Sequence, residues 1–352
     1  MNEQRNLYLA IGISIAIIIF FQMLLPTQTI QNPTLENEES LEPATSIDGQ
    51  SKKLVEEVQS REDVISKTER VTFKNLSVEG SINLKGGIID DLILSKYKDS
   101  LEPESDNIQL LSPDGTANPY YIETGWKELK ESNIDLPNLE TKWKSDSVNL
   151  TPNNPVNLTW TNNQDVTFKI RYSIDEEYMF SITQEIVNNS TSTLQLFPYR
   201  LIKRINTPDT INFFILHEGL ISLLNDELLE KNYDDISEDC SSLLQTKKSF
   251  CDNKSQGGWL GFTDKYWMSA LIPDADQSIN VNYRHSNNGR DNYRAGYVGQ
   301  VYNITAKNSL SYSGKLFIGA KKLDVLSSYD EKLSIPRFTD AIDWGWFSFL
   351  TK

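Results

Sequence analysis

The side chains capable of acid–base chemistry are few and scattered along the chain. The two histidines are His217, which precedes Glu218, and His285. A lone histidine in a chain of this kind is more often a structural or surface residue than a general base. Adjacent acidic residues at 176–177 and 234–235 lie in polar stretches, which are typical of solvated loops rather than of a carboxylate dyad with divergent pKa values.

Motifs for nucleotide binding or hydrolysis are absent from the sequence. It contains no G-x-x-x-x-G-K-[ST] loop, no G-x-G-x-x-G, no H-E-x-x-H and no G-x-S-x-G. Two cysteines and two histidines are also too few for the usual zinc cages or iron–sulfur clusters. We therefore expect no catalytic residue, no metal site, no cofactor and no enzymatic activity.

The two cysteines, Cys240 and Cys251, lie close together in a polar stretch. In an oxidising compartment they could form a disulfide, which would add roughly 3 kcal/mol to stability in the chain-entropy model. Two unpaired thiols are an equal alternative, because the sequence contains no geometry. In either state the pair is expected to be structural.

The N-terminal residues predict the compartment. Residues 7–25, LYLAIGISIAIIIFFQMLL, contain no charge, and as a helix they would extend about 28 Å, close to the bilayer core. A signal peptide has a shorter apolar region and small residues at its cleavage site, and a buried core helix is the other alternative. We predict a retained transmembrane anchor over 1–25. Arg5 precedes it and Lys52 is the next basic residue, which favours a cytoplasmic N-terminus and a periplasmic bulk at a bacterial inner membrane.

Beyond the anchor the composition changes twice. Residues 26–68 are rich in Pro, Gln, Glu, Ser and Thr, which predicts a disordered periplasmic linker. Residues 69–332 then show period-two alternation, most clearly over 166–174 and 178–186, which predicts an antiparallel hairpin around a short polar turn. Further strands are predicted at 71–78, 81–84, 88–94, 155–160, 193–202, 259–263, 266–272, 279–284, 297–303 and 316–319.

These strands are not interleaved with helices, so the fold class is mainly β, a sandwich of antiparallel sheets. The one short helix expected inside this domain lies at 218–230. The chain has 34 Lys and Arg against 49 Asp and Glu, a net charge of −15. Nucleic acid is thereby excluded as a main partner, and a polybasic contact with anionic lipid is disfavoured.

The C-terminal residues 333–352 are expected to form an amphipathic helix at the membrane interface. Ile342, Trp346, Phe349 and Leu350 follow the spacing of one helix face. Trp344 and Phe347 flank that face, and tryptophan favours the headgroup region. A helix docked on the β domain is the alternative. The aromatic residues are placed as if a second membrane span should follow Lys352.

Three stretches resemble the YidC family of membrane protein insertases of Gram-negative bacteria. They are MNEQRNLYLAIGISI at the start, then SINLKGGIIDDLILSKY with IQLLSP, and finally GGWLGFTDKYWMSALIPD with LFIGAKKLDVLSSY and AIDWGWFSFLTK. The resemblance implies a periplasmic β-super-sandwich similar to galactose mutarotase. It also implies a protein that inserts nascent membrane proteins into the lipid bilayer, alone or with the Sec translocon (SecYEG and SecDF), without a cofactor.

The family's working part is a bundle of five further spans, and no hydrophobic run follows residue 352 in this sequence. We therefore expect this chain to be the N-terminal part of an insertase: its first span, its periplasmic domain and the interfacial helix. The alternative is a membrane-anchored periplasmic carbohydrate-binding or scaffold domain. In a carbohydrate-binding domain, the stacking surfaces would come from Trp126, Trp143, Trp160, Trp259 and Trp267.

Overall fold

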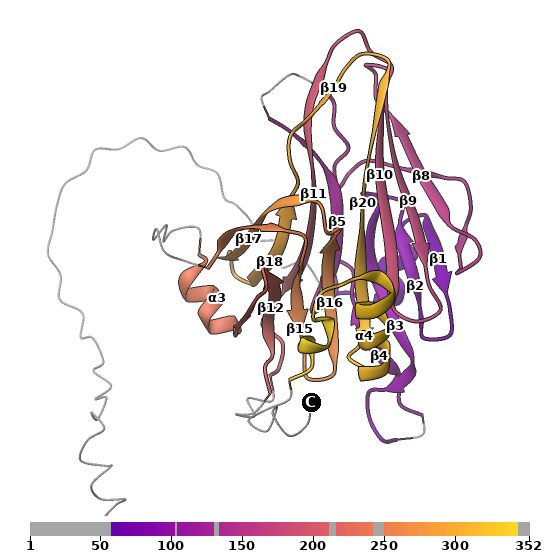
Figure 1. The fold of residues 1–352 in the computed structure, drawn as a ribbon. Helices are drawn as coiled ribbons and strands as arrows, with labels where there is room; N and C mark the ends of the chain where they lie inside the picture. Colours follow the sequence, from indigo (N-terminus) through magenta and orange to yellow (C-terminus); the bar gives the residue numbers. More distant parts are fainter. Residues whose placement is uncertain (1–57, 103, 130–133, 211–215, 242–249, 344–352) are drawn as a thin grey trace, which may run out of the picture. The chain divides into compact units, whose positions relative to one another are not determined.

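The computed structural model of the chain describes residues 58–102, 104–129, 134–210, 216–241 and 250–343. Two large β-sheets dominate these residues, and a few short helices lie beside them (Figure 1). The strand pairs are antiparallel except for one short parallel pair, β1 with β7. The predicted class, mainly β with antiparallel sheets, is confirmed.

The larger sheet, called sheet 1, contains eleven strands. In hydrogen-bonded order they are β14 (Asp252–Gln256), β17 (Ser278–Asn287), β18 (Asp291–Val298), β11 (Leu194–Ile205), β5 (Tyr120–Glu128), β3 (Ile88–Lys98), β2 (Val78–Asn83), β1 (Arg70–Lys74) and β7 (Asn149–Leu150); β19 (Tyr302–Ile304) pairs with β11, and β4 (Asn107–Leu111) pairs with β3.

The other sheet, called sheet 2, contains nine strands. Their order is β13 (Glu227–Lys231), β12 (Gly219–Leu224), β15 (Trp259–Thr263), β16 (Trp267–Pro273), β20 (Asn308–Ala320), β10 (Met179–Asn188), β9 (Val166–Ile174), β8 (Val156–Thr161) and β6 (Lys144–Ser145). The helices are α2 (Arg61–Ile65), α3 (Tyr233–Asp239), α4 (Leu323–Leu333) and the 3-10 turn η1 (Phe338–Ala341).

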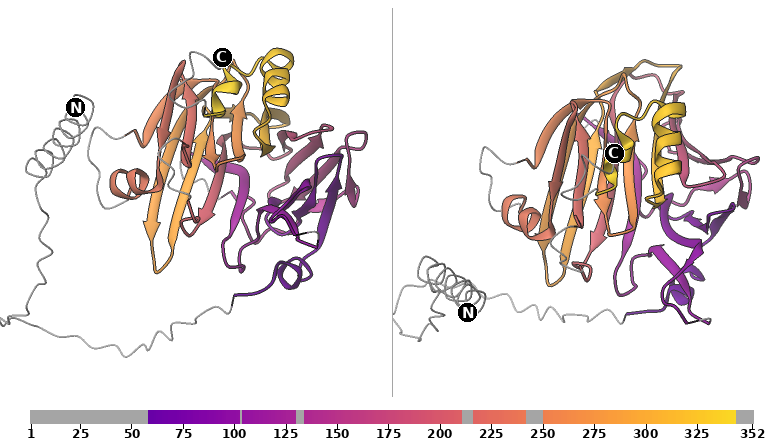
Figure 2. Two further views of the ribbon diagram at one scale, coloured as in Figure 1. Left: turned by 90° about the horizontal axis from the view of Figure 1, so that it is seen from below. Right: turned by 60° about the horizontal axis from the view of Figure 1, so that its bottom comes forward.

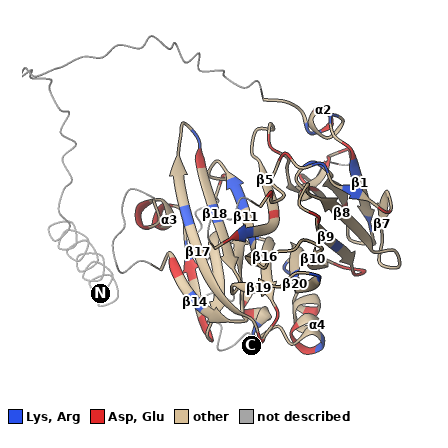
Figure 3. Cartoon of the chain, turned by 90° about the horizontal axis from the view of Figure 1, so that it is seen from above, with Lys and Arg blue, Asp and Glu red and all other residues tan. Residues whose placement is uncertain are grey.

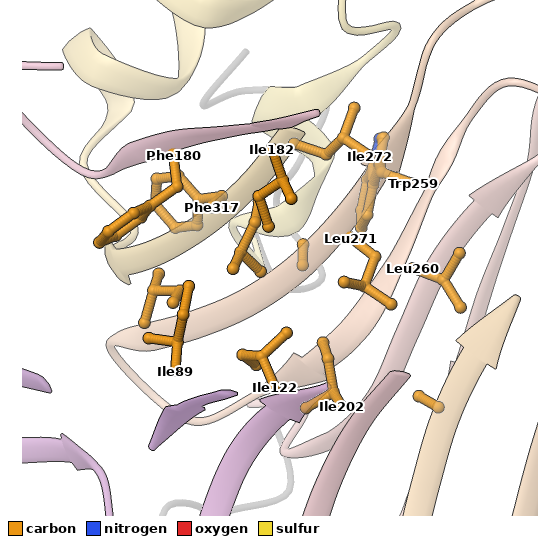
Figure 4. Packing of buried hydrophobic residues seen from close by; sticks show 14 of the residues in the cluster. Ile89, Ile122, Phe180, Ile182, Ile202, Trp259, Leu260, Leu271, Ile272 and Phe317 are labelled. Atoms are coloured by element: carbon orange, nitrogen blue, oxygen red, sulfur yellow. The ribbon is translucent and has the colours of Figure 1, made fainter. Parts of the chain in front are cut away.

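The main core lies between the two sheets. Strand β9 alternates buried and less buried residues along its whole length, so its apolar face points to sheet 1 as period-two patterning requires. The Phe73 ring of sheet 1 meets the Phe180 ring of sheet 2 edge to face, with centroids 5.2 Å apart. Figure 4 shows Ile122 and Ile202 of sheet 1 facing Ile182 of sheet 2 in the same layer.

A fully buried arginine also joins the two sheets. Arg200 on β11 is 0% exposed and donates from Nε to Gln184 Oε1 (3.1 Å) and from Nη2 to the Ile182 carbonyl (2.8 Å). Its guanidinium lies over the Tyr312 ring, 5.6 Å from the centroid. Gly314 leaves room for it, since a Cβ there would lie 2.4 Å from Arg200 Nη1. The buried charge is thus held by carbonyl oxygens and an aromatic face.

The predicted hairpin over 166–186 is confirmed as β9 and β10, which pair in antiparallel register from Phe180 with Ile174 to Asn188 with Val166. The predicted strand over 297–303 is wrong as a single element. It straddles the end of β18 at Val298 and the start of β19 at Tyr302.

The helix expected at 218–230 is wrong. This segment forms the antiparallel hairpin of β12 and β13, joined by Asn225 and Asp226. Both turn residues have positive φ, 50° and 69°, as the two-residue turns of hairpins require. The Asn-Asp pair is therefore a turn signal inside a stretch whose apolar residues could equally suit a helix.

Ordered structure begins before residue 69, so the predicted linker boundary is too late. Ser60 caps α2 by accepting from the Asp63 backbone N–H, and Arg61 donates from Nε to Asp91 Oδ1 at 2.6 Å. The predicted anchor and most of the predicted linker lie outside the described residues. Among the residues described here, no helix has the length and apolar character to span a membrane.

Gly261 on β15 offers a test of the sheet 2 packing. A Cβ at this position would lie 1.9 Å from the Ser269 carbonyl oxygen, which is backbone of the neighbouring strand and cannot turn aside. We expect Gly261→Ala to lower the free energy of unfolding by about 3 kcal/mol, measured by urea denaturation of the whole chain.

Gly289→Ala serves as the matched control for this substitution. Nothing lies within 4 Å of a Cβ at Gly289, so only its positive φ of 91° opposes a side chain. Its cost should be about 1 kcal/mol. Equal losses for the two variants would contradict the close strand approach at Gly261.

Candidate functional site

The residues that follow β20 pack on the outer face of sheet 2. We call residues 321–343 the C-terminal segment; it includes α4 and η1 and is seen beside sheet 2 in Figure 2. In α4 the residues Val325, Leu326 and Tyr329 are buried, a spacing that places them on one side of the helix. The segment therefore forms a second, smaller apolar layer outside the sandwich.

Phe317 on β20 is the centre of this layer. Its ring contacts those of Tyr178, Tyr329 and Phe338 at centroid distances of 5.9, 6.1 and 5.4 Å. The last five residues of β20 are all buried, because one face meets sheet 1 and the other meets the C-terminal segment. Trp259 on β15 extends the layer: its ring meets Phe338 and its Nε1 donates to the Pro336 carbonyl at 3.0 Å.

The backbone after α4 does not continue as a helix. Ser334 and Arg337 adopt the left-handed conformation, with φ of 54° and 48°, and only the short η1 follows. Ile342 is extended, with φ −87° and ψ 122°. The predicted amphipathic helix starting at 333 is thus wrong over 334–343, because the chain turns there to insert Phe338 into the apolar layer. At the end of the described segment, Asp343 Oδ2 accepts from the His217 backbone N–H at 2.9 Å.

A groove of about 750 Å³ lies between α4 and the turn that joins β9 to β10. We call it the α4 groove. Its apolar lining comes from Ile174, Met179, Val325, Tyr329 and Leu333. Its charged lining is mostly acidic: Asp175, Glu176, Glu177 and Asp324 against the single cation Lys332. Figure 3 shows α4 with its charged residues beside β10 and β20.

The walls of the α4 groove are joined by hydrogen bonds. The Tyr329 hydroxyl donates to Asp175 Oδ2 at 2.6 Å and accepts from the Tyr178 backbone N–H at 3.1 Å. Asp175 Oδ1 also accepts from the backbone N–H groups of Glu177 and Met179, both at 2.9 Å. The helix wall and the turn wall are therefore connected through a single phenol, and the groove is preformed.

A second polar cluster surrounds the cysteines. Cys240 and Cys251 are joined by a disulfide with a Cα–Cα distance of 5.6 Å, which connects the end of α3 to the start of β14. Beside it, His285 Nδ1 lies 3.0 Å from Ser241 Oγ, and His285 Nε2 lies 2.9 Å from Asp291 Oδ1. The hydrogen bond to His285 lowers the pKa of the Asp291 carboxyl.

This serine, histidine and aspartate lie in a row, but Ser241 Oγ donates to the Ser237 carbonyl at 2.7 Å. His285 is only 6% exposed, so the cluster ties α3 to β17 rather than presenting a nucleophile. The other histidine, His217, places Nε2 2.7 Å from the Leu220 carbonyl. Both histidines therefore have structural partners. In the described ranges, no group of three His, Cys, Asp or Glu side chains could hold a metal ion.

The five tryptophans considered as sugar-stacking surfaces do not form an exposed platform. Trp126, Trp143 and Trp259 are buried in the core. Trp160 packs on Phe168, and Trp267 packs edge to face on Tyr97. Their indoles thus contribute to packing, which leaves the carbohydrate-binding alternative without the surfaces on which it depended.

A group of partly buried charges lies where β20 ends and the C-terminal segment begins. Arg204 donates from Nη1 to Asp264 Oδ1 at 2.7 Å and to the Tyr233 hydroxyl at 2.9 Å. Lys321 donates from Nζ to Thr263 Oγ1 at 2.7 Å. Burial lowers the pKa of the Lys321 ammonium to about 8, although nearby carboxylates such as Asp264 act in the opposite direction.

The interfacial residues predicted from the sequence, Trp344, Trp346, Phe347, Phe349 and Leu350, lie outside the described residues. The structure places only the residues directly before them, which are held on sheet 2. From the sequence, docking on the β domain was only the alternative to an interfacial helix. Its signal was the run of continuously apolar residues at the end of β20, which indicates a strand covered on both faces.

Lys321 should make stability depend on pH in a defined window. Because its folded-state pKa lies below the ordinary value of 10.5, the unfolded chain binds more protons between these two values, and stability should rise with pH there. We expect the free energy of unfolding of the native chain to rise relative to that of Lys321→Met from pH 8 to about 9.5. Urea unfolding at each pH measures it.

The range ends below pH 10 because the buried tyrosines, whose pKa values burial raises, would destabilise the fold above it. Lys322→Met is the matched control, since the Lys322 side chain is 38% exposed and pairs with Asp324 near the surface. A pH dependence that is unchanged in Lys321→Met would show that the ammonium is not buried as described.

Solved structures show a slight likeness to this chain. A galactose mutarotase related enzyme from Lactobacillus acidophilus is 7% identical, with a TM-score of 0.46, over 71% of this chain and 97% of that one. A likeness of that size assigns neither a fold type nor a ligand.

Sequence relatives are much closer. "Membrane protein insertase YidC" of Rickettsia bellii is 37% identical over 354 residues, which cover 100% of this chain and 61% of that protein. The protein of the same name from Methylobacterium radiotolerans is 33% identical over 380 residues, 100% of this chain and 60% of that protein. The chain thus spans about three fifths of the length of these relatives. A family model described as the YidC periplasmic domain matches residues 70–352, which include every strand of both sheets and the C-terminal segment, so the chain belongs to the YidC periplasmic domain family.

Proposed function

We propose that this chain is the N-terminal part of a membrane protein insertase, which inserts, folds and assembles integral inner-membrane proteins. The observation that carries the proposal is the family match over residues 70–352, together with relatives of that name aligned along the whole chain. The proposal assigns the chain a role in protein transport rather than in chemical catalysis, and it needs no cofactor.

In this proposal the chain has four parts. Residues 1–25 are the transmembrane anchor, with a cytoplasmic N-terminus. Residues 26–57 are the periplasmic linker, shortened from the predicted 26–68 because α2 is already part of the folded domain. The two sheets form the periplasmic domain, for which we propose the super-sandwich arrangement of galactose mutarotase. Residues 344–352 lie at the membrane interface.

The C-terminal segment gives the periplasmic domain a mechanical role. Because Phe338 and Tyr329 are packed against sheet 2, the chain leaves the domain at residue 343 in a fixed position. The next residues include Trp344, Trp346 and Phe347, followed by Phe349 and Leu350, which favour the headgroup region. We infer that the domain determines the point, at residue 343, from which this stretch continues toward the membrane.

The proposed partners follow from the family. They are nascent membrane proteins as substrates, the lipid bilayer, and the Sec translocon, namely SecYEG and SecDF. The disulfide between Cys240 and Cys251 supports an oxidising location such as the periplasm, since structural disulfides are rare in the cytosol.

A chimera tests the proposed function. This chain would replace the aligned N-terminal 61% of the Rickettsia bellii relative in a bacterium depleted of its own insertase. We expect the chimera to insert a short single-span protein to within about twofold of the unmodified relative, judged by protease protection of the substrate. The control is the same strain without a plasmid-borne insertase. A chimera that reaches the membrane intact but inserts no more substrate than that strain would contradict the proposal.

The interfacial role of the last residues is tested with a peptide of residues 334–352. Replacing Trp344 and Trp346 by Ser should weaken its partitioning into phosphatidylcholine vesicles at least about tenfold, because two indoles leave the headgroup region. Co-sedimentation with the vesicles measures the bound fraction. Thr339→Ser with Thr351→Ser is the control and should change nothing. Unchanged partitioning of the tryptophan variant would instead assign these residues to the β domain.

A further inference from the structure

We propose that the α4 groove is a docking site for a cationic, partly apolar peptide segment of another protein, with Lys or Arg side chains seated in the groove. This inference goes beyond the proposed function, which assigns no role to the groove. Three properties carry it: the size of the groove, the excess of acidic groups over its single cation, and the apolar surface beneath them.

The size and lining suit side chains rather than a small ion. A volume of about 750 Å³ lies within the range of pockets that enclose organic ligands. Val325, Met179 and Leu333 provide an apolar floor, on which the methylene stem of a Lys or Arg side chain can lie while its charged head reaches the acidic rim. A hydrated metal ion would not be stabilised by contact with this apolar floor.

The acidic side chains of the groove differ in how many hydrogen-bond or ion-pair partners they already have. Both carboxylate oxygens of Asp175 already accept hydrogen bonds, from the Tyr329 hydroxyl and from two backbone N–H groups. Glu177 Oε2 accepts from Ser77 Oγ at 2.7 Å. Glu176 is exposed, and among the described residues it has no recorded hydrogen bond or ion pair. Asp324 is exposed and pairs only loosely with Lys322, at 3.5 Å. Glu176 on the turn and Asp324 on the helix are therefore the two carboxylates available to an incoming cation.

The charge of each possible binding partner also indicates which of them the acidic α4 groove would attract. The chain's own residues 26–57 contain seven Asp or Glu and only two Lys, so the acidic rim would repel them. A second copy of a chain with net charge −15 and anionic lipid are disfavoured for the same reason. A segment rich in Lys or Arg from a different protein is the complementary partner.

The test uses the full chain in phosphatidylcholine nanodiscs and a fluorescein-labelled peptide, Gly-Arg-Leu-Arg-Leu-Arg-Gly, followed by fluorescence anisotropy at low salt. We expect saturable binding above that of empty nanodiscs, weakened by 0.5 M salt. The double variant Glu176→Gln with Asp324→Asn should weaken binding about five- to tenfold. Lys332→Gln should strengthen it about twofold, because a like charge leaves the groove.

The control variant is Glu227→Gln with Glu230→Gln, which removes two exposed acids on β13, five strands away from β10 in sheet 2. It should bind the peptide like the native chain. The proposal is overturned if the groove variant binds as tightly as this control, if the peptide with Glu in place of Arg binds equally well, or if spermidine competes as effectively as unlabelled peptide. Because no insertion activity is measured, failure here leaves the proposed function standing, and failure of the chimera leaves this test unaffected.

Discussion

The structure depends on the double burial of β20. This strand lies near the middle of sheet 2, between β10 and β16, and its last five residues are buried on both faces. Its inner face is covered by sheet 1, as in any sandwich, but its outer face would expose Phe317 to water. The C-terminal segment provides the missing cover through Tyr329 and Phe338. A strand in the centre of an antiparallel sheet thereby acquires the continuous apolar character that is more typical of buried parallel strands.

The packing of the C-terminal segment on sheet 2 also explains the path of the backbone over residues 334–343. A segment that only linked the domain to a membrane span would need no buried residues, and its backbone would be free to follow the span. Here the left-handed residues Ser334 and Arg337 turn the chain so that Phe338 enters the apolar layer, and Asp343 accepts from the His217 backbone. The exit point is thus determined by packing.

Polar groups inside the molecule are used to connect elements rather than to do chemistry. Arg200 bonds to a carbonyl and an amide of sheet 2 from sheet 1, and Arg204 joins β11 to Asp264 and to Tyr233 of α3. His285 similarly ties Ser241 to Asp291 beside the disulfide. Each of these side chains has at least two hydrogen-bond partners, which offset the cost of burying its polar atoms, although Arg200 Nη1 itself has no hydrogen-bond partner among the described residues. The α4 groove differs, since Glu176 and Asp324 remain open to solvent.

Features that depend on neighbours in the chain could be predicted from the order of the residues. Alternation over 166–186 was enough to predict β9, β10 and their pairing, and the motif runs were enough to indicate the family, because both signals are local. Local signals failed where two structures suit the same residues: the stretch at 218–230 was predicted as a helix, although the Asn225-Asp226 turn makes it a hairpin. Contacts between residues far apart in the chain could not be predicted in this way. The bond between Tyr329 and Asp175 joins residues 154 positions apart, and the α4 groove exists only because α4 returns to the β9–β10 turn. Contacts of that separation follow from the burial of apolar faces against each other, which the order of residues does not reveal.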